Sequence, residues 1–260
     1  MFNKIVLAYI RVMAVSYCIV PVSPLRSRPA HDSEMVSQLV FGEACQVNET
    51  AGKGFVKVTC IHDGYQGFCS ENQLMAGSDE PGHESVHAVA AEWSNTVYTA
   101  AGVPMQVPMG SLFPAAFKDH FQVDKDFLHP FFKWDEEDIK KISGMYLNTP
   151  YLWGGRTVFG ADCSGFIQMV MRFFNKELPR DASHQAGVGE EVGIDDVHCG
   201  DLAFFELKDR VVHVGLLFDR DTIIHAYGKV RIDQLDQEGI VNSETGVRTH
   251  VLHSIRRIRN

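Results

Sequence analysis

The stretch that decides the fold of this chain is YLWGGRTVFGADCSGFIQMVMRFF, residues 151–174. Its first half is rich in glycine, and its second half has apolar residues at 166, 167, 170, 173 and 174, which is the spacing of one helix face. Cys163 falls in the first turn of this predicted helix, where unpaired N–H groups and the helix dipole lower the pKa of a thiol. The stretch therefore predicts a nucleophilic cysteine, with an inert buried cysteine as the alternative.

Two histidines downstream are candidate partners of this thiol. Residues 200–207, 211–218 and 222–226 have the composition of strands, and the last two are joined by the short turn Asp219–Asp221. With the turn centred near Arg220, antiparallel partners have numbers that sum to about 440, so His213 and His225 are neighbours within the error of strand register. A cysteine nucleophile needs a base and a second polar group that holds the base in its working tautomer. Together with Cys163, the two histidines supply this set.

Four short motifs occur in this part of the chain in a fixed order that is characteristic of one type of domain. The strings DCSGF (162–166), GDLAFF (200–205), HVGLL (213–217) and IHA (224–226) resemble the NlpC/p60 cell-wall cysteine peptidases, over residues 139–258. The resemblance implies a circularly permuted papain-like domain, in which the nucleophile helix precedes a small antiparallel sheet bearing the histidines. It implies Cys163 as nucleophile, His213 as base and His225 as the orienting third member. It also implies that the Tyr151 hydroxyl shares the oxyanion hole with the Cys163 N–H.

The sequence before this domain predicts short strands joined by turns. The strings QLVFGE (38–43), GFVKV (54–58) and DGYQGF (63–68) resemble a bacterial SH3-like domain, with Phe68 where that domain commonly has tryptophan. The expected fold class is α+β, with one or more N-terminal SH3-like β-barrels followed by the permuted papain-like domain. The expected boundaries are 1–16 for an N-terminal segment of uncertain role, 17–78 for the SH3-like domain, 79–134 for an insertion or a degenerate second barrel, and 135–260 for the catalytic domain.

This pairing of domains narrows the expected substrate. It resembles the γ-D-glutamyl-L-diamino-acid endopeptidases of the dipeptidyl-peptidase VI type, which cut peptidoglycan stem peptides with a free N-terminal L-alanine. The resemblance implies acidic residues that pair with the substrate ammonium, aromatic walls and further polar contacts. The matching positions are Glu43 and Asp162 as acids, Tyr65 and Trp153 as walls, and Ser164 and Ser183 as polar contacts. Each also has an ordinary structural interpretation, such as a turn residue or a core aromatic.

We therefore predict a cysteine endopeptidase or dipeptidyl-peptidase of cell-wall turnover and recycling. One alternative is a non-catalytic protein that binds cell-wall fragments, and the intact Cys/His/His set argues against it. Another is an amidase or acyltransferase on the same fold, and the barrel with Glu43 argues against that. The expected partners are peptidoglycan-derived peptides, and the chain is expected to be a monomer.

Composition and motifs argue against several other classes of protein. The net charge of −9 argues against nucleic acid and anionic membrane surfaces as partners, because both require basic patches. The six cysteines form no C-x-x-C pair and look reduced, and no H-E-x-x-H string is present, so neither a cofactor nor a metal is expected. No run reaches the ~20 apolar residues of a membrane span. Residues 2–10 begin like a secretory signal that Arg11 interrupts, which leaves the bacterial cytoplasm and the periplasm both open.

Overall fold

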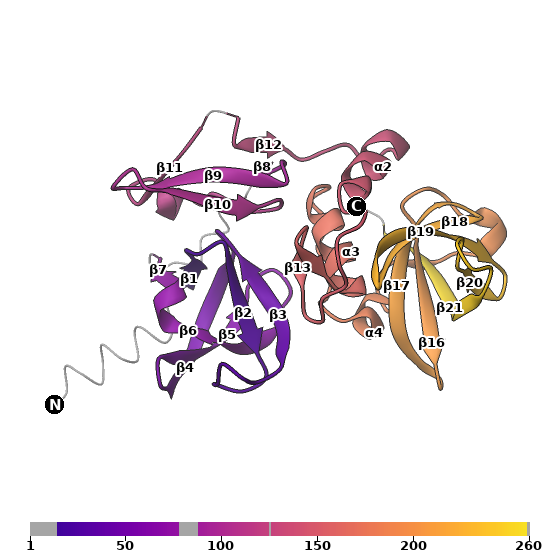
Figure 1. Cartoon of the computed structure of the whole chain (residues 1–260), viewed down its shortest axis with the longest axis horizontal. Helices are drawn as coiled ribbons and strands as arrows, with labels where there is room; N and C mark the ends of the chain where they lie inside the picture. Colours follow the sequence, from indigo (N-terminus) through magenta and orange to yellow (C-terminus); the bar gives the residue numbers. More distant parts are fainter. Residues whose placement is uncertain (1–14, 78–87, 125, 259–260) are drawn as a thin grey trace. The chain divides into compact units, whose positions relative to one another are not determined.

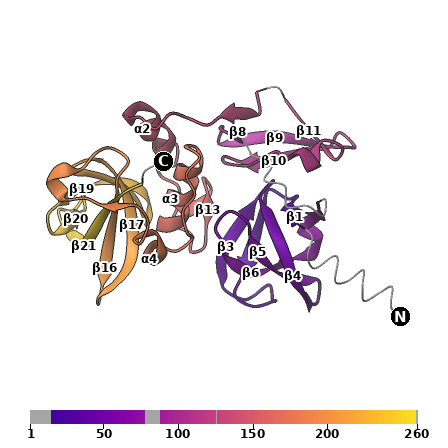
Figure 2. The same cartoon turned by 180° about the vertical axis from the view of Figure 1, so that it is seen from behind.

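The computed structural model describes residues 15–77, 88–124 and 126–258 (Figures 1 and 2). The chain divides into two compact units, Met1–Phe131 and Phe132–Asn260, and each is considered by itself. The expected N-terminal segment 1–16 and the signal-like run within it fall almost entirely outside the described residues.

The first unit opens with an antiparallel sheet in the order β3-β2-β6-β5-β4-β1-β7. Its strands are β1 Val15–Cys18, β2 Val22–Arg26, β3 Met35–Val40, β4 Ala44–Gly52, β5 Phe55–Cys60, β6 Gln66–Ser70 and β7 Leu74–Ala76, with the 3-10 turn η1 Glu71–Gln73 before the last. A hairpin turn joins β5 to β6: Asp63 Oδ1 accepts a hydrogen bond from Tyr65 N at 2.9 Å, and Gly64 has a φ of +69°. Four cysteines, 18, 45, 60 and 69, are buried in the apolar core of this sheet, where they act as small hydrophobic residues.

The rest of the first unit shares a second core with this sheet. Its elements are β8 Ala88–Ala90, β9 Ser94–Thr99, β10 Pro104–Pro108, η2 Ala115–Phe117, β11 Phe121–Val123 and β12 Leu128–Pro130, arranged as a β10-β9-β11 sheet and a β12-β8 pair. Phe41, which follows β3, packs on Phe117 and Phe121 with ring centroids 4.9 and 5.2 Å apart. Residues 88–130 are therefore packed onto the first sheet through aromatic side chains.

The second unit begins with α2, Glu136–Gly144, capped by Asp135, whose side chain accepts a hydrogen bond from Asp138 N. The short strands β13 Arg156–Thr157 and β14 Gly160–Ala161 lead into α3, Cys163–Arg172, and then α4, Ala182–Gln185. The main sheet contains β15 Glu190–Glu191, β16 Leu202–Leu207, β17 Arg210–Asp219, β18 Thr222–Tyr227, β19 Lys229–Asp236, β20 Gly239–Val241 and β21 Arg248–Arg257, with η3 Ile194–Asp196 after the first.

This sheet closes on itself, because β21 pairs with both β16 and β20 and so completes a six-stranded barrel. Apolar side chains fill its interior: Ala203, Phe205, Leu217, Ile223, Leu235, Ile240 and Ile255. The predicted fold class is confirmed, a largely β chain with few helices, in which the nucleophile helix precedes the strands that bear the histidines. Among the described residues, no helix has the length and apolar character that crossing a membrane requires.

The strand register agrees with the sequence analysis. Gly215 pairs with His225, Leu216 with Ile224 and Leu217 with Ile223, so the partners' numbers sum to 440 as expected. His213 is thus two residues along β17 from the residue directly opposite His225. The two histidines are diagonal neighbours on one face of the sheet, a distance that long or aromatic side chains can bridge.

We predict that Gly42→Ala destabilises the first unit more than Gly54→Ala does. Both glycines have positive φ, +84° and +76°, so both substitutions carry the ~1 kcal/mol cost of that backbone conformation. A Cβ at Gly42 would in addition lie 2.1 Å from Leu112 O, whereas nothing lies within 4 Å of one at Gly54. Thermal unfolding followed by circular dichroism measures both, and equal losses of Tm would contradict the close approach at Gly42.

Candidate active site

Cys163 is the first residue of α3, at the position the sequence predicts. Asp162 is the N-cap, and its Oδ1 accepts a hydrogen bond from Gly165 N at 2.7 Å. A Cβ on Gly165 would lie 2.2 Å from Gly155 O, so only glycine lets the preceding loop pack this closely on the first turn. Cys163 itself is 6% exposed, and the loop and the helix together fix its backbone.

The state of the thiol differs from the expectation. Burial raises the pKa of Cys163 to about 12, and the neighbouring Asp162 carboxylate adds to the increase. Hydrogen bonds from the backbone N–H groups of Val214 and Ser164 lower the pKa, but burial outweighs them. The prediction of a lowered thiol pKa from the helix N-terminus alone is therefore wrong. The sulfur holds its proton at neutral pH and requires a base.

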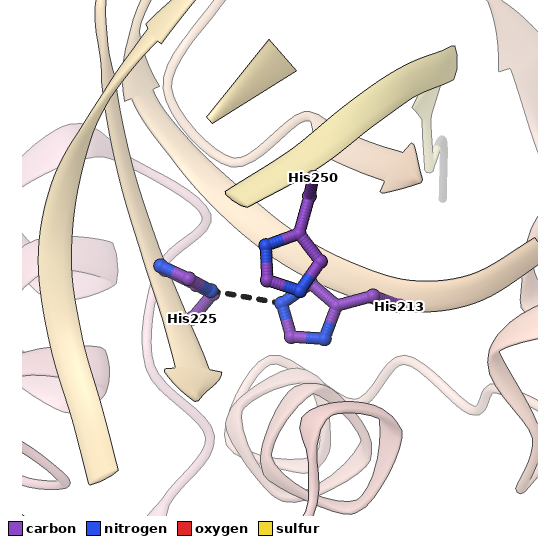
Figure 3. A group of neighbouring side chains, drawn as sticks. All are labelled: His213, His225 and His250. Carbon is purple, nitrogen blue, oxygen red and sulfur yellow. Dashed lines mark hydrogen bonds between the residues drawn. The ribbon is translucent and has the colours of Figure 1, made fainter. Parts of the chain in front are cut away.

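The predicted base and its partner are in contact. His213 Nε2 and His225 Nδ1 are 2.8 Å apart, and both side chains are buried (Figure 3). Burial, together with His225 and His250, holds the pKa of His213 well below its usual value. Burial also lowers the pKa of His225, although Asp233 opposes the shift. His213 is consequently a neutral imidazole, the form that can accept a proton, and the next residue, Val214, contacts the Cys163 sulfur.

Three further residues of this cluster were missed by the sequence analysis. His225 Nε2 lies 3.1 Å from Asp233 Oδ2, and Arg231 donates to both oxygens of that carboxylate at 2.8 and 3.0 Å. His250, on β21, stacks on His213 with ring centroids 4.2 Å apart and an interplanar angle of 21° (Figure 3). Strand alternation could have revealed Asp233 in the sequence. Asp233 is two residues from the buried Leu235 on β19, so both side chains face the interior rather than solvent.

The histidine cluster also has the spacing of a metal site. One ring nitrogen from each of His213, His225 and His250 lies within 4.8 Å of the others. The stacked rings of His213 and His250, however, direct their in-plane lone pairs side by side rather than toward one point, and the His213–His225 hydrogen bond uses two of the nitrogen atoms. This geometry favours stacking and hydrogen bonding over chelation.

Asp162 and Ser164, predicted to contact substrate, are held by Arg180. The guanidinium donates to Asp162 Oδ1 at 3.0 Å, to Asp162 Oδ2 at 2.5 Å and to Ser164 Oγ at 2.9 Å, and Gly154 N donates to Asp162 Oδ2 at 2.9 Å. All three side chains are buried. Because Arg180 neutralises Asp162 and its oxygens are already hydrogen-bonded, this geometry favours a structural role for Asp162 over binding of an ammonium group.

The remaining predicted residues of the second unit surround this centre or lie at the surface. Burial, with Cys163 and Asp162 nearby, raises the pKa of Tyr151 to about 12, so its hydroxyl keeps the proton that an oxyanion-hole donor needs. Trp153 is 61% exposed and available as a wall. Ser183 lies on α4 and is exposed.

Glu43 and Tyr65 belong to the first unit. Glu43 is 2% exposed, its Oε2 accepts a hydrogen bond from Val40 N at 2.8 Å, and His62 Nε2 lies 3.7 Å from Oε1. Tyr65 is half-buried against the core of the sheet. Glu43 is therefore a buried carboxylate at a tight turn and not the solvated turn residue of the alternative interpretation.

Both domains match known families. Residues 148–249 match the NlpC/P60 family, and residues 25–74 match the bacterial dipeptidyl-peptidase Sh3 domain. These matches confirm both resemblances on which the sequence analysis relied.

Individual proteins are also similar to this chain. The chain is 28% identical over 218 residues to a Bacillus subtilis (strain 168) protein named γ-D-glutamyl-L-lysine dipeptidyl-peptidase, covering 75% of this chain and 73% of that one. It is 41% identical over 99 residues to the probable endopeptidase NlpC of Escherichia coli (strain K12), covering 35% of this chain and 64% of that one. The structure of an NlpC/P60 family protein from Bacillus cereus superposes with a TM-score of 0.77 at 19% identity, covering 94% of this chain and 99% of that one, which confirms the fold.

We predict that iodoacetamide alkylates Cys163 at pH 7 through proton transfer to His213, and that His213→Ala slows this reaction. Because the pKa of His213 is lowered, the imidazole stays neutral, and the alkylation rate should hold as the pH falls through 6.5. Peptide mapping by mass spectrometry gives the rate at each cysteine. Cys199 is the internal reference, because burial raises its pKa to about 11. If His213→Ala left the rate at Cys163 unchanged, His213 would not be the base.

Proposed function

Because residues 148–249 of this chain match the NlpC/P60 family of peptidases, we propose that it hydrolyses the γ-D-glutamyl-L-diamino acid bond of peptidoglycan stem peptides with a free N-terminal L-alanine. The observation that carries the proposal is the buried His213–His225 hydrogen bond beside a capped Cys163. The name of the Bacillus subtilis relative, whose similarity covers 75% of this chain, supports this choice of bond. Such an activity would serve cell-wall turnover and recycling.

The proposed reaction begins with proton transfer from the Cys163 thiol to His213 Nδ1, the ring nitrogen that is not bonded to His225. The sulfur attacks the γ-D-glutamyl carbonyl carbon, and the oxyanion accepts hydrogen bonds from the Cys163 N–H and the Tyr151 hydroxyl. His213 then donates its proton to the leaving amine of the diamino acid. A water molecule, deprotonated by the same imidazole, hydrolyses the thioester and regenerates the thiol.

Recognition of the substrate ammonium is assigned to Glu43. Its burial means that an ammonium group beside it would gain more than a solvated pair does, because the local dielectric is low. The Asp162 carboxylate is paired with the buried Arg180 guanidinium. We propose that Tyr65 and Trp153 are apolar walls and that Ser183 is a polar contact, while Asp162 and Ser164 act by shaping the loop that carries the nucleophile.

We predict that Cys163→Ala and Cys163→Ser abolish hydrolysis of L-Ala-γ-D-Glu-diaminopimelate and leave the fold intact, since Cys163 contributes chemistry rather than packing. Product analysis by mass spectrometry and far-UV circular dichroism test the two halves of this statement. Cys199→Ala is the matched control and should retain activity. Turnover by the alanine variant would contradict the mechanism, and binding without turnover by the wild-type protein would favour a cell-wall-binding protein.

We also predict that acetylating the amine of the L-alanine lowers kcat/KM about ten- to a hundred-fold. The modification removes one charge-assisted hydrogen bond, which is worth ~1.5–3 kcal/mol. Glu43→Gln should weaken cleavage of the free-amine peptide and reduce the penalty for acetylation, whereas Glu49→Gln, at an exposed position of β4, should change neither. Equal rates on both peptides would rule out recognition of the ammonium and leave the first unit as a targeting module.

A further inference from the structure

Three polar side chains form a continuous chain of hydrogen bonds across adjacent strands of the barrel. His213 on β17, His225 on β18 and Asp233 on β19 are each offset by two residues from direct pairing, since Gly215 is opposite His225 and Ile223 is opposite Asp233. The contacts are His213 Nε2 to His225 Nδ1 at 2.8 Å and His225 Nε2 to Asp233 Oδ2 at 3.1 Å. Side chains of this parity point into the barrel, as Leu217, Ile223 and Leu235 do.

The hydrogen-bond chain ends at the ionised carboxylate of Asp233. Burial by itself would raise the pKa of Asp233, but hydrogen bonds from His225, Ser243 N and Arg231 outweigh burial and lower it. Arg231, directly opposite His225 on β19, forms a two-pronged pair with this carboxylate, and its other contact is Glu244 at 3.6 Å. Among the described residues, the other titratable groups that pack against this hydrogen-bond chain are Tyr227 on β18, which stacks on His225, and His250 on β21. Asp233 therefore carries no proton and can only accept hydrogen bonds.

We propose that Asp233 is a positioning residue that fixes the tautomer of His213 through His225. Because Asp233 accepts, His225 must carry its proton on Nε2, which leaves His225 Nδ1 as an acceptor. His213 must then donate to that atom from Nε2, which leaves His213 Nδ1 unprotonated. This is the nitrogen that accepts the thiol proton, so the inference rests on the proposed function and deepens it.

The same hydrogen-bond chain also stabilises the transition state of the proposed reaction. When His213 takes the thiol proton it becomes a cation inside a buried site, where an unpaired charge is unfavourable. The negative charge of Asp233, two hydrogen bonds away, compensates for it, and Arg231 keeps Asp233 ionised and oriented in the resting enzyme. Without Asp233, both histidines could adopt either tautomer, and part of the population would present an N–H to the sulfur.

The direct test is ¹⁵N NMR of the full-length protein labelled at histidine, because ¹⁵N shifts distinguish protonated from bare ring nitrogens. The variants His213→Asn and His225→Asn assign the signals. We expect neutral rings with the proton on Nε2 in both His213 and His225. A proton on Nδ1 of either ring would overturn the inference. This readout needs no substrate, so its failure is distinguishable from failure of the proposed peptide hydrolysis.

Asp233→Asn provides the second test. We expect kcat to fall about 10- to 100-fold, the loss typical of an outer hydrogen-bond partner, with KM unchanged and with mixed tautomers at His213. Asp236→Asn is the matched control: it lies on the same strand, pairs with Arg248 at the surface, and should leave kcat and the tautomers as they are.

A loss of stability must be separated from a loss of positioning, since Asp233→Asn leaves Arg231 beside a neutral group. The double variant Asp233→Asn/Arg231→Gln removes the unbalanced charge and should recover Tm while kcat stays low. Recovery of kcat together with Tm would show that Asp233 is only structural. Should Asp233→Asn not fold, the ¹⁵N spectrum of the wild-type protein still decides, because a proton on Nδ1 of His213 or His225 would overturn the inference.

Discussion

The carboxylate of Asp162 is the constraint on which the catalytic unit depends. It caps the first turn of α3 through Gly165 N, holds the preceding loop through Gly154 N, and ties both to the segment before α4 through Arg180. A buried ion pair offers little net stability, but loss of either partner leaves a buried charge. The Asp162–Arg180 pair instead positions the nucleophile. It fixes the backbone N–H and the sulfur of Cys163 before any substrate arrives, as transition-state stabilisation requires.

A second constraint is the polar end of the barrel. Its interior is apolar, yet His213, His225, Asp233 and His250 share the inward parity of that core and form one layer of it. Polar groups in such surroundings are tolerated only when they are hydrogen-bonded or stacked, and here each is. The layer is mostly neutral, with its one carboxylate compensated by Arg231, so the barrel contains the proposed base, His213, without an unpaired charge in its core.

Features set by local sequence were predictable. The start of α3, the caps at Asp135 and Asp162, the β5–β6 turn and the β17–β18 register follow from short-range patterns, and the last of these placed the two histidines together. Asp233 and His250 were missed because a charged residue or histidine on a strand is ordinarily expected to face solvent, and only closure of the barrel turns these two inward. Arg180 was missed because its partners, Asp162 and Ser164, lie 18 and 16 residues away along the chain. The thiol pKa was misjudged for the same reason, since burial is a property of the whole domain and the helix terminus is a local one.

Burial shifts the pKa values of Cys163 and His213 in opposite directions, and these shifts determine how the proposed reaction begins. It raises the pKa of the Cys163 thiol and lowers that of the His213 imidazole, so both are neutral before substrate binds. Burial therefore disfavours a thiolate–imidazolium pair in the free enzyme. In the proposed reaction, proton transfer becomes favourable only as negative charge passes from sulfur to the carbonyl oxygen, where the proposed N–H and hydroxyl donors stabilise it. The fixed tautomer of His213 matters more in such an enzyme, because the base must be ready when the attack begins.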